Sequence, residues 1–218
     1  MLETWFDPAA IAIVFAGTLA ATLLRCGLAD CRIALAALSG LFDKPFDPAQ
    51  AKAELSVQVR EIANDGFLRA EPRRFGDSEF DSLSDLIINQ RSIQSLHGEH
   101  AKFADARLAH AQTAMRVFDN AAELAPVLGL AGTLVALAQA PGASAQDSGL
   151  VGAIAMAVIT TLYGLVAANF LFAPIGSAIG RKSRKEERDR EAVLEWLEEG
   201  IRSTGAATSA AQPASHAA

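Results

Sequence analysis

Two apolar stretches contain no charged side chain: LAPVLGLAGTLVALAQA at residues 124–140 and LVGAIAMAVITTLYGLVAANFLFA at residues 150–173. Between them, residues 141–149 read PGASAQDSG, and this mixture of proline, glycine and small polar residues is typical of a turn. An uncharged apolar stretch of roughly 20 residues is long enough to cross a bilayer as a helix. Residues 124–180 therefore predict two transmembrane helices joined by a short connector.

A third apolar stretch, residues 8–24, also lacks charged side chains. The residues before it include Glu3 and Asp7 but no Lys or Arg, so they lack the positive start of a secretory signal, and we expect this stretch to remain a membrane anchor. Positive side chains follow the stretches at residues 8–24 and 150–173 but are missing from the connector: Arg25, Arg32, Lys44, Arg181, Lys182, Arg184 and Lys185. By the positive-inside rule, the N-terminus and the connector face outward, and the C-terminus faces the cytoplasm.

Residues 25–123 predict a helical cytoplasmic domain. Residues 31–42 are amphipathic and can carry the first helix onward out of the membrane. Two further helices have typical capping residues at their start. Asp47, followed by Pro48, can cap the first of them, and Asp77 or Ser78 can cap the second. We expect the second of these helices to break near Gly98 and then to continue into the membrane.

Residues 181–202 predict a charged helix, and residues 203–218 consist mainly of Ala, Ser, Thr and Pro, which predicts a disordered tail. No segment alternates in the manner of a strand. The predicted fold class is therefore all-α, a polytopic membrane protein with one transmembrane helix in residues 1–24, two in residues 124–180, and the helical domain between the first and the second.

Each of the two later spans has one face of small residues. In the order of the chain these residues are Ala125, Gly129, Gly132, Ala136, Ala140, Ala153, Ala157, Thr161, Gly164 and Ala168. Such faces let helices approach closely in lipid. Two interpretations stay open. The faces, with Gly129, Gly132 and Gly164, serve helix packing, or they line a cavity that accepts another helix.

The spans contain no Asp, Glu, His, Lys or Arg. Proton carriers need a titratable group within the membrane, so a second protein would have to supply the carboxylate for any proton current. The hydroxyls of Thr133 and Thr161, which lie on or beside the small faces, could hydrate an ion pathway, and Thr160 is a further candidate. Pro126 and Pro174 stand near the ends of the two spans, where a proline frees a carbonyl and bends the helix.

Several motifs resemble the MotA/TolQ/ExbB proton-channel family, and those of the last span resemble MotA-type flagellar stator subunits in particular. The resemblance covers most of residues 7–180 and is carried by Glu123–Thr133, by Ala153–Gly164 with Ala168-Asn169 and Ala173-Pro174-Ile175, by Asp7–Ala21, and by Asp65–Glu71. MotA-type proteins have a further N-terminal membrane helix, and this sequence begins where their second helix would. Three spans is the number found in TolQ and ExbB.

The resemblance implies a five-copy ring in the bacterial inner membrane around two copies of a single-span partner of the MotB/TolR/ExbD kind, whose aspartate binds and releases the ion. It implies that Thr133 and Thr161 line the pore and that Pro126 and Pro174 couple ion passage to conformational change. The candidate charges for torque, or for contact with a rotor protein, form a cluster of Arg69, Glu71, Arg73, Arg74, Asp77 and Glu79.

The leading hypothesis is thus a proton-driven stator subunit, followed by an energiser of the TolQ/ExbB kind. A non-conducting membrane scaffold is the alternative from another class. An enzyme is not expected, since the only cluster that could bind a metal is His97 with His100, which departs from the HExxH pattern. No cofactor, metal or nucleic-acid partner is predicted.

Overall fold

The computed structural model describes residues 8–65, 76–90, 93–139 and 147–210, and every secondary-structure element in these ranges is a helix. Three of the helical stretches are long and apolar enough to cross a membrane. The prediction of an all-helical chain with three membrane-spanning helices is therefore confirmed. The elements are α1 (Pro8–Gly40), α2 (Pro48–Asp65), α3 (Ser78–Gln90), α4 (Ile93–Ala138), α5 (Asp147–Val166), the π-helix η2 (Ala167–Phe172) and α6 (Ala173–Ala210).

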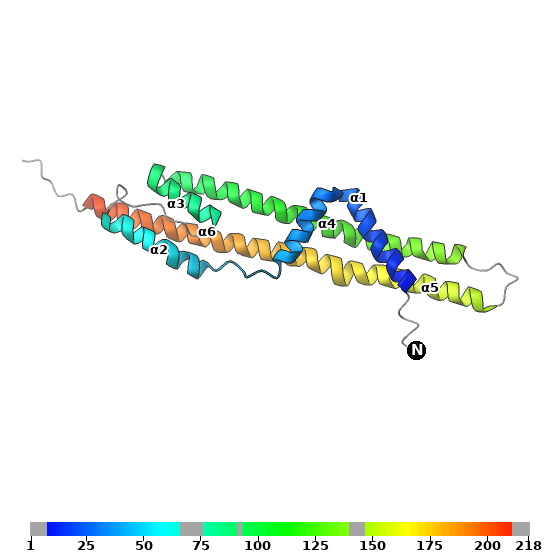
Figure 1. Cartoon of the computed structure of the whole chain (residues 1–218). Helices are drawn as coiled ribbons and strands as arrows, with labels where there is room; N and C mark the ends of the chain where they lie inside the picture. The colour runs from blue at the N-terminus through cyan, green and yellow to red at the C-terminus, as the bar shows by residue number, and fades with distance from the viewer. Residues whose placement is uncertain (1–7, 66–75, 91–92, 140–146, 211–218) are drawn as a thin grey trace, which may run out of the picture. The chain divides into compact units, whose positions relative to one another are not determined.

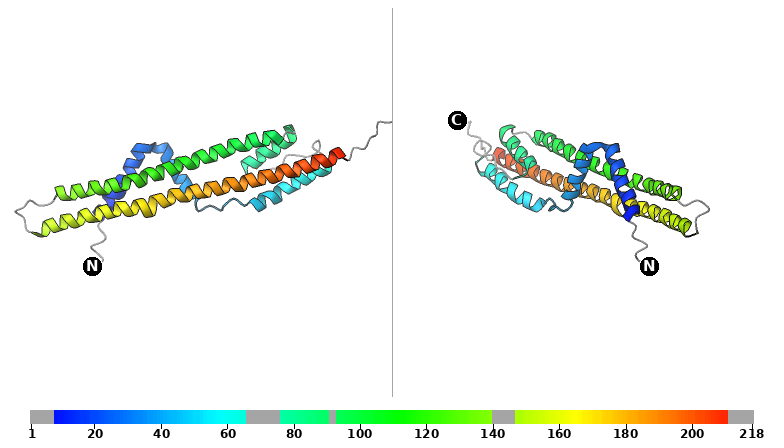
Figure 2. Two further views of the ribbon diagram at one scale, coloured as in Figure 1. Left: turned by 180° about the vertical axis from the view of Figure 1, so that it is seen from behind. Right: turned by 45° about the vertical axis from the view of Figure 1, so that its right-hand side comes forward.

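The chain forms two compact units, and the helices α4 and α6 each contribute residues to both. The first unit contains residues 1–43 and 109–182. In it, α5 lies alongside the C-terminal half of α4, and α1 crosses this pair (Figures 1 and 2). Its core consists of side chains from α1, α4, η2 and α6 that are mostly small, with Phe118, Phe172 and Ile179 as the large members.

The outer surface of the first unit is apolar. Large hydrophobic side chains on α4 and α5 are exposed in the single chain, among them Leu134 at 69% and Val158 at 64%. An apolar surface of this extent is unfavourable in water and suits lipid or the surface of another membrane helix.

The second unit contains residues 44–108 and 183–218 and packs α2 and α3 beside α6 (Figure 2). One apolar cluster holds it together: Leu55, Phe80, Leu83, Leu96, Val193, Leu194, Leu197 and Ile201. The predicted caps are present. The Asp47 carboxylate accepts the backbone N–H of Ala49 at 2.9 Å, and the Asp77 carboxylate accepts that of Glu79 at 3.0 Å.

Three boundaries differ from the sequence prediction. The first helix does extend to Gly40, but it bends at Gly27, whose φ of +84° is a left-handed conformation that glycine adopts without strain. The prediction of a break near Gly98 was wrong, because α4 is helical through that position. No atom lies within 4 Å of the position that a β-carbon on Gly98 would take. The glycine therefore costs the helix no packing contact and only lowers its intrinsic helix propensity, which does not break the helix.

The third difference concerns the end of the last span. We expected a separate charged helix after it, but α5, η2 and α6 follow one another without a gap from Asp147 to Ala210. Residues 203–210, which the sequence assigned to the tail, belong to α6, while residues 211–218 lie outside the described ranges. The helix continues beyond Pro174 because the wider turn of η2 directly precedes this proline, and such a local adjustment can accommodate a residue that lacks an N–H.

Candidate functional site

The backbones of α4 and α5 touch at glycines. A β-carbon placed on Gly164 would lie 2.6 Å from the carbonyl oxygen of Ala125, and one on Gly129 would lie 2.9 Å from the carbonyl oxygen of Thr160. A β-carbon on Gly132 would lie 3.0 Å from the Thr160 Cβ. Any larger residue at these positions would push the helices apart. Close approach of this kind supplies the packing energy that apolar burial cannot supply in lipid.

The three candidate threonines differ in exposure. Thr160 is fully buried within the chain, whereas Thr133 and Thr161 are half-buried. All three hydroxyls donate to carbonyl oxygens of their own helix, Thr133 to Leu130 at 2.6 Å and Thr160 and Thr161 to Ala157 at 2.9 and 3.3 Å. A hydroxyl that donates in this way can still accept a hydrogen bond. Thr133 and Thr161 can do so from their exposed sides, while Thr160 is enclosed.

The two prolines lie in different surroundings. Pro126 is half-buried inside α4, and Pro174 is exposed at the second position of α6. The π-helix η2 directly precedes Pro174, and the N–H of Ala173 donates to the carbonyl oxygen of Ala168, five residues back. Such wide turns are uncommon in helices and frequently occur at functional sites.

Polar contacts tie α1 to α4 on both sides of the bend at Gly27. They are Arg25 Nη1 with Glu123 Oε2 at 3.1 Å, Asn120 Nδ2 with Cys26 Sγ at 3.2 Å, and Arg116 Nη2 with Asp30 Oδ2 at 2.7 Å. The three residues of α4 are three or four positions apart and therefore share one helix face. These contacts fix α1 at the end of α4 where its charged residues begin.

Four of the six predicted torque charges, Arg69, Glu71, Arg73 and Arg74, lie outside the described residues. The other two, Asp77 and Glu79, belong to a buried ionic cluster of the second unit. Its centre is Glu79, the second residue of α3, which is 1% exposed.

Three basic side chains surround the Glu79 carboxylate. His100 Nδ1 lies 2.5 Å from Oε1, while Arg107 Nη1 and Arg190 Nη1 lie 2.5 and 2.9 Å from Oε2. His100 and Arg107 come from α4, and Arg190 comes from α6. Glu187 of α6 closes the network by pairing with Arg107 Nη2 at 2.9 Å. We call Glu79, His100, Arg107, Glu187 and Arg190 the Glu79 junction.

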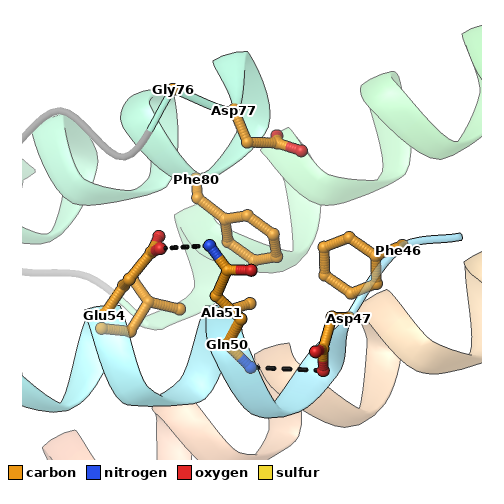
Figure 3. A pocket seen from close by; sticks show the side chains of 9 residues that line it. Phe46, Asp47, Gln50, Ala51, Glu54, Gly76, Asp77 and Phe80 are labelled. Carbon is orange, nitrogen blue, oxygen red and sulfur yellow. Dashed lines mark hydrogen bonds between the residues drawn. The ribbon is translucent and has the colours of Figure 1, made fainter. Parts of the chain in front are cut away.

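Asp77 extends this junction to the surface. Burial disfavours its charge, yet the hydrogen bond and the positive charge of Arg190, together with the backbone amides of Glu79 and Phe80, hold the pKa of Asp77 below its usual value. The Arg190 guanidinium also lies 4.5 Å from the centre of the Phe46 ring, which stacks on Phe80. These aromatic rings border a pocket of about 190 Å³ at the first turns of α2 and α3 (Figure 3).

The two histidines considered for metal binding have other partners. His100 belongs to the Glu79 junction, and His97 Nε2 lies 2.6 Å from Glu198 Oε1. Among the described residues, no group of three or more His, Cys, Asp or Glu side chains is arranged to hold a metal ion.

Both the glycine contact and the Glu79 junction fall within a region that matches a known family. The sequence model of the MotA/TolQ/ExbB proton channel family matches residues 70–192, more than half of the chain. The chain belongs to this family. A MotA/TolQ/ExbB protein with three such helices is a multi-pass membrane protein.

Several similar proteins are named for motility or chemotaxis. Motility protein A of Cereibacter sphaeroides is 30% identical over 146 residues, which are 65% of this chain and 56% of that protein. Chemotaxis protein PomA of Vibrio alginolyticus is 25% identical over 199 residues, 88% of this chain and 76% of that protein. The alignment with Motility protein A of Borreliella burgdorferi covers only 31% of that protein at 37% identity, so the matched length differs widely between relatives.

The fold agrees with the family. The flagellar MotAB stator complex from Bacillus subtilis contains a chain that superposes with a TM-score of 0.81 at 22% identity, covering 91% of this chain and 79% of that one. The MotAB structure from C. jejuni gives the same TM-score at 15% identity. At these identities the likeness establishes the fold alone.

The sequence reasoning missed two buried threonines of α1. Thr18 and Thr22 are 0% and 4% exposed. The Thr18 hydroxyl donates to the Val14 carbonyl, whereas the Thr22 hydroxyl has no hydrogen-bond partner in the described part of the chain. Their spacing of four residues places them on one face of α1, a signal that was available from the sequence.

Arg190 could also have been found from the sequence. It lies three, four and seven positions before Val193, Leu194 and Leu197, so it continues the apolar stripe of α6. A charged residue on an apolar stripe indicates a buried ion pair. Its partner Glu79 could not have been identified in this way, because the two are 111 positions apart.

Proposed function

We propose that this chain is the ring-forming subunit of a proton-driven stator complex in the bacterial inner membrane, with its N-terminus outside and its C-terminus in the cytoplasm. Five copies would surround two copies of a single-span partner. A carboxylate of that partner would take up and release the proton, and each event would turn the ring by one step.

The proposal rests mainly on the composition of the two membrane helices that lie in the region matched by the family model. The apolar stretches at residues 124–140 and 150–173 contain hydroxyls but no Asp, Glu, His, Lys or Arg. A chain of this kind can hydrate a proton but cannot hold it on a carboxylate, so the titratable group has to come from another protein. Thr133 and Thr161, which are half-buried, are the hydroxyls that this proposal assigns to the pathway.

The prolines and the π-helix give the proposal a mechanical element. Pro126 inside α4 and Pro174 after η2 interrupt the regular hydrogen bonding of both helices, which makes these positions candidates for conformational coupling. The work available from the electrical gradient is about 2.3 kcal/mol per charge per 100 mV, enough to bias a step between two arrangements of similar free energy.

The torque would be delivered to a rotor protein by the charged segment before α3, with Arg69, Glu71, Arg73 and Arg74. The names of the relatives, motility and chemotaxis proteins, favour the stator over an energiser of the TolQ/ExbB kind.

The test is the replacement of Thr133 and Thr161 by valine, which keeps the shape and removes the hydroxyl. With the partner present, we expect a several-fold loss of inward proton flux at normal assembly. Thr113→Val is the matched control, because Thr113 lies in α4 outside the apolar stretch, and it should leave the flux unchanged. Serine at positions 133 and 161 should restore the flux. Normal flux in the double valine variant would instead favour a non-conducting scaffold.

A further inference from the structure

The Glu79 junction joins three helices through one carboxylate. Glu79 begins α3, His100 and Arg107 lie in α4, and Arg190 lies in α6. The three basic side chains reach the carboxylate from both long helices at 2.5 to 2.9 Å. A change in the relative position of α4 and α6 at this level would therefore act directly on the start of α3.

Every polar side chain of the junction has a partner. His100 Nε2 lies 3.5 Å from Glu187 Oε1, and Arg107 also binds Glu187. Arg190 Nη2 binds Asp77 at 2.8 Å and Glu186 at 3.1 Å. A buried carboxylate without partners would be strongly unfavourable, whereas a complete network fixes the direction of each side chain.

Stability alone does not account for this network. Apolar side chains already attach α3 to the rest of the second unit, since Phe80 and Leu83 are buried against Leu55, Leu96 and Val193. Replacing a buried ionic network by apolar residues of similar volume is often neutral or stabilising. What the charges add is a fixed register among three helices, a role for which buried polar groups are best attested.

The position of the junction in the chain suggests its purpose. In the sequence, α4 leads into residues 124–138 of one apolar stretch, and α6 follows α5 and η2 of the other. On the other side, α3 follows Arg69, Glu71, Arg73 and Arg74, four of the charges that were predicted to exert torque.

We propose that the Glu79 junction transmits force from α4 and α6 to the start of α3, with Glu79, Arg107 and Arg190 as positioning residues for torque and not for ion passage. This inference rests on the proposed stator function. It predicts that weakening the junction separates the two activities. Protons still pass, but less work reaches the rotor.

The test is Glu79→Gln in the full chain, expressed with its partner in cells whose motility depends on it. We expect fewer complexes in the membrane, because the buried arginines lose a charged partner. Each incorporated complex should show normal proton flux and a clear loss of torque, measured as the speed increment of a tethered bead. Glu198→Gln is the matched control. Glu198 is a carboxylate with a 12% exposed side chain that pairs α6 with α4 through His97, and its replacement should leave torque unchanged.

Equal torque in Glu79→Gln and the unmodified chain would overturn the inference, as would an equal loss in both variants. If Glu79→Gln fails to reach the membrane, Arg107→Lys decides. It keeps the charge but loses the simultaneous contact with Glu79 and Glu187, and normal torque in this variant would also overturn the inference. Absence of proton flux in the unmodified complex would contradict the proposed function itself, which is a separate result.

Discussion

The α4–α5 contact and the Glu79 junction hold helices together by opposite means. At the first, glycines bring two backbones together and no ionisable side chain takes part. At the second, long charged side chains bridge three helices around a carboxylate that is 1% exposed. The α4–α5 contact requires residues without a side chain, whereas the Glu79 junction requires paired charges. Different substitutions should therefore disrupt the two contacts.

The largest effect is expected at the junction. Arg190→Met removes the pairs with Asp77, Glu79 and Glu186 while keeping the length of the side chain. Because buried charges lose their partner, unfolding should become easier by about 3–5 kcal/mol. Arg25→Met, which removes a pair between side chains that are 51% and 65% exposed, should cost less than about 1 kcal/mol. Thermal melting of both variants in detergent measures the contrast, and equal shifts would contradict it.

At the glycine contact, Gly164→Ala should destabilise the pair of helices by about 1–3 kcal/mol through overpacking. The added β-carbon would meet the Ala125 backbone oxygen at 2.6 Å, and a backbone cannot rotate away as a side chain does. Gly152→Ala in the same helix is the control, since nothing lies within 4 Å of its β-carbon. Subunit assembly on a native gel should be impaired only in the first variant. If both variants assemble alike, close packing is not the role of Gly164.

The smallest effect has the opposite sign. Gly98 is exposed in α4, and a β-carbon there would meet no neighbouring atom within 4 Å. Gly98→Ala should therefore stabilise the second unit by about 0.8–1 kcal/mol through helix propensity alone. A small rise in the melting temperature would support this expectation. A fall would show that the glycine is needed for a contact with another chain.

Most of the fold could be predicted from sequence patterns that span only neighbouring residues. The three apolar stretches and the caps at Asp47 and Asp77 depend only on local sequence, and the structure has them where they were expected. The bend at Gly27 was not predicted, because an isolated glycine is compatible with a straight helix. The continuation past Pro174 was not predicted either, because a proline usually ends or bends a helix.

The two contacts were unequally accessible from the sequence. Gly129, Gly132 and Gly164 stood out through their spacing, and they are the residues at which α4 and α5 touch. The partners of Glu79 are 21, 28 and 111 positions away, so no local period relates them. The functional roles of these glycines and of the Glu79 junction, like those of Thr133, Thr161 and the prolines, stay predictions.

The central claim is that the membrane helices of this chain lack the group that carries the proton. The direct test is gradient-driven proton uptake into vesicles that contain this chain alone, this chain with its single-span partner, or this chain with a partner whose membrane carboxylate is replaced by the amide. The account predicts uptake only in the second preparation. Equal uptake by the chain alone would contradict it.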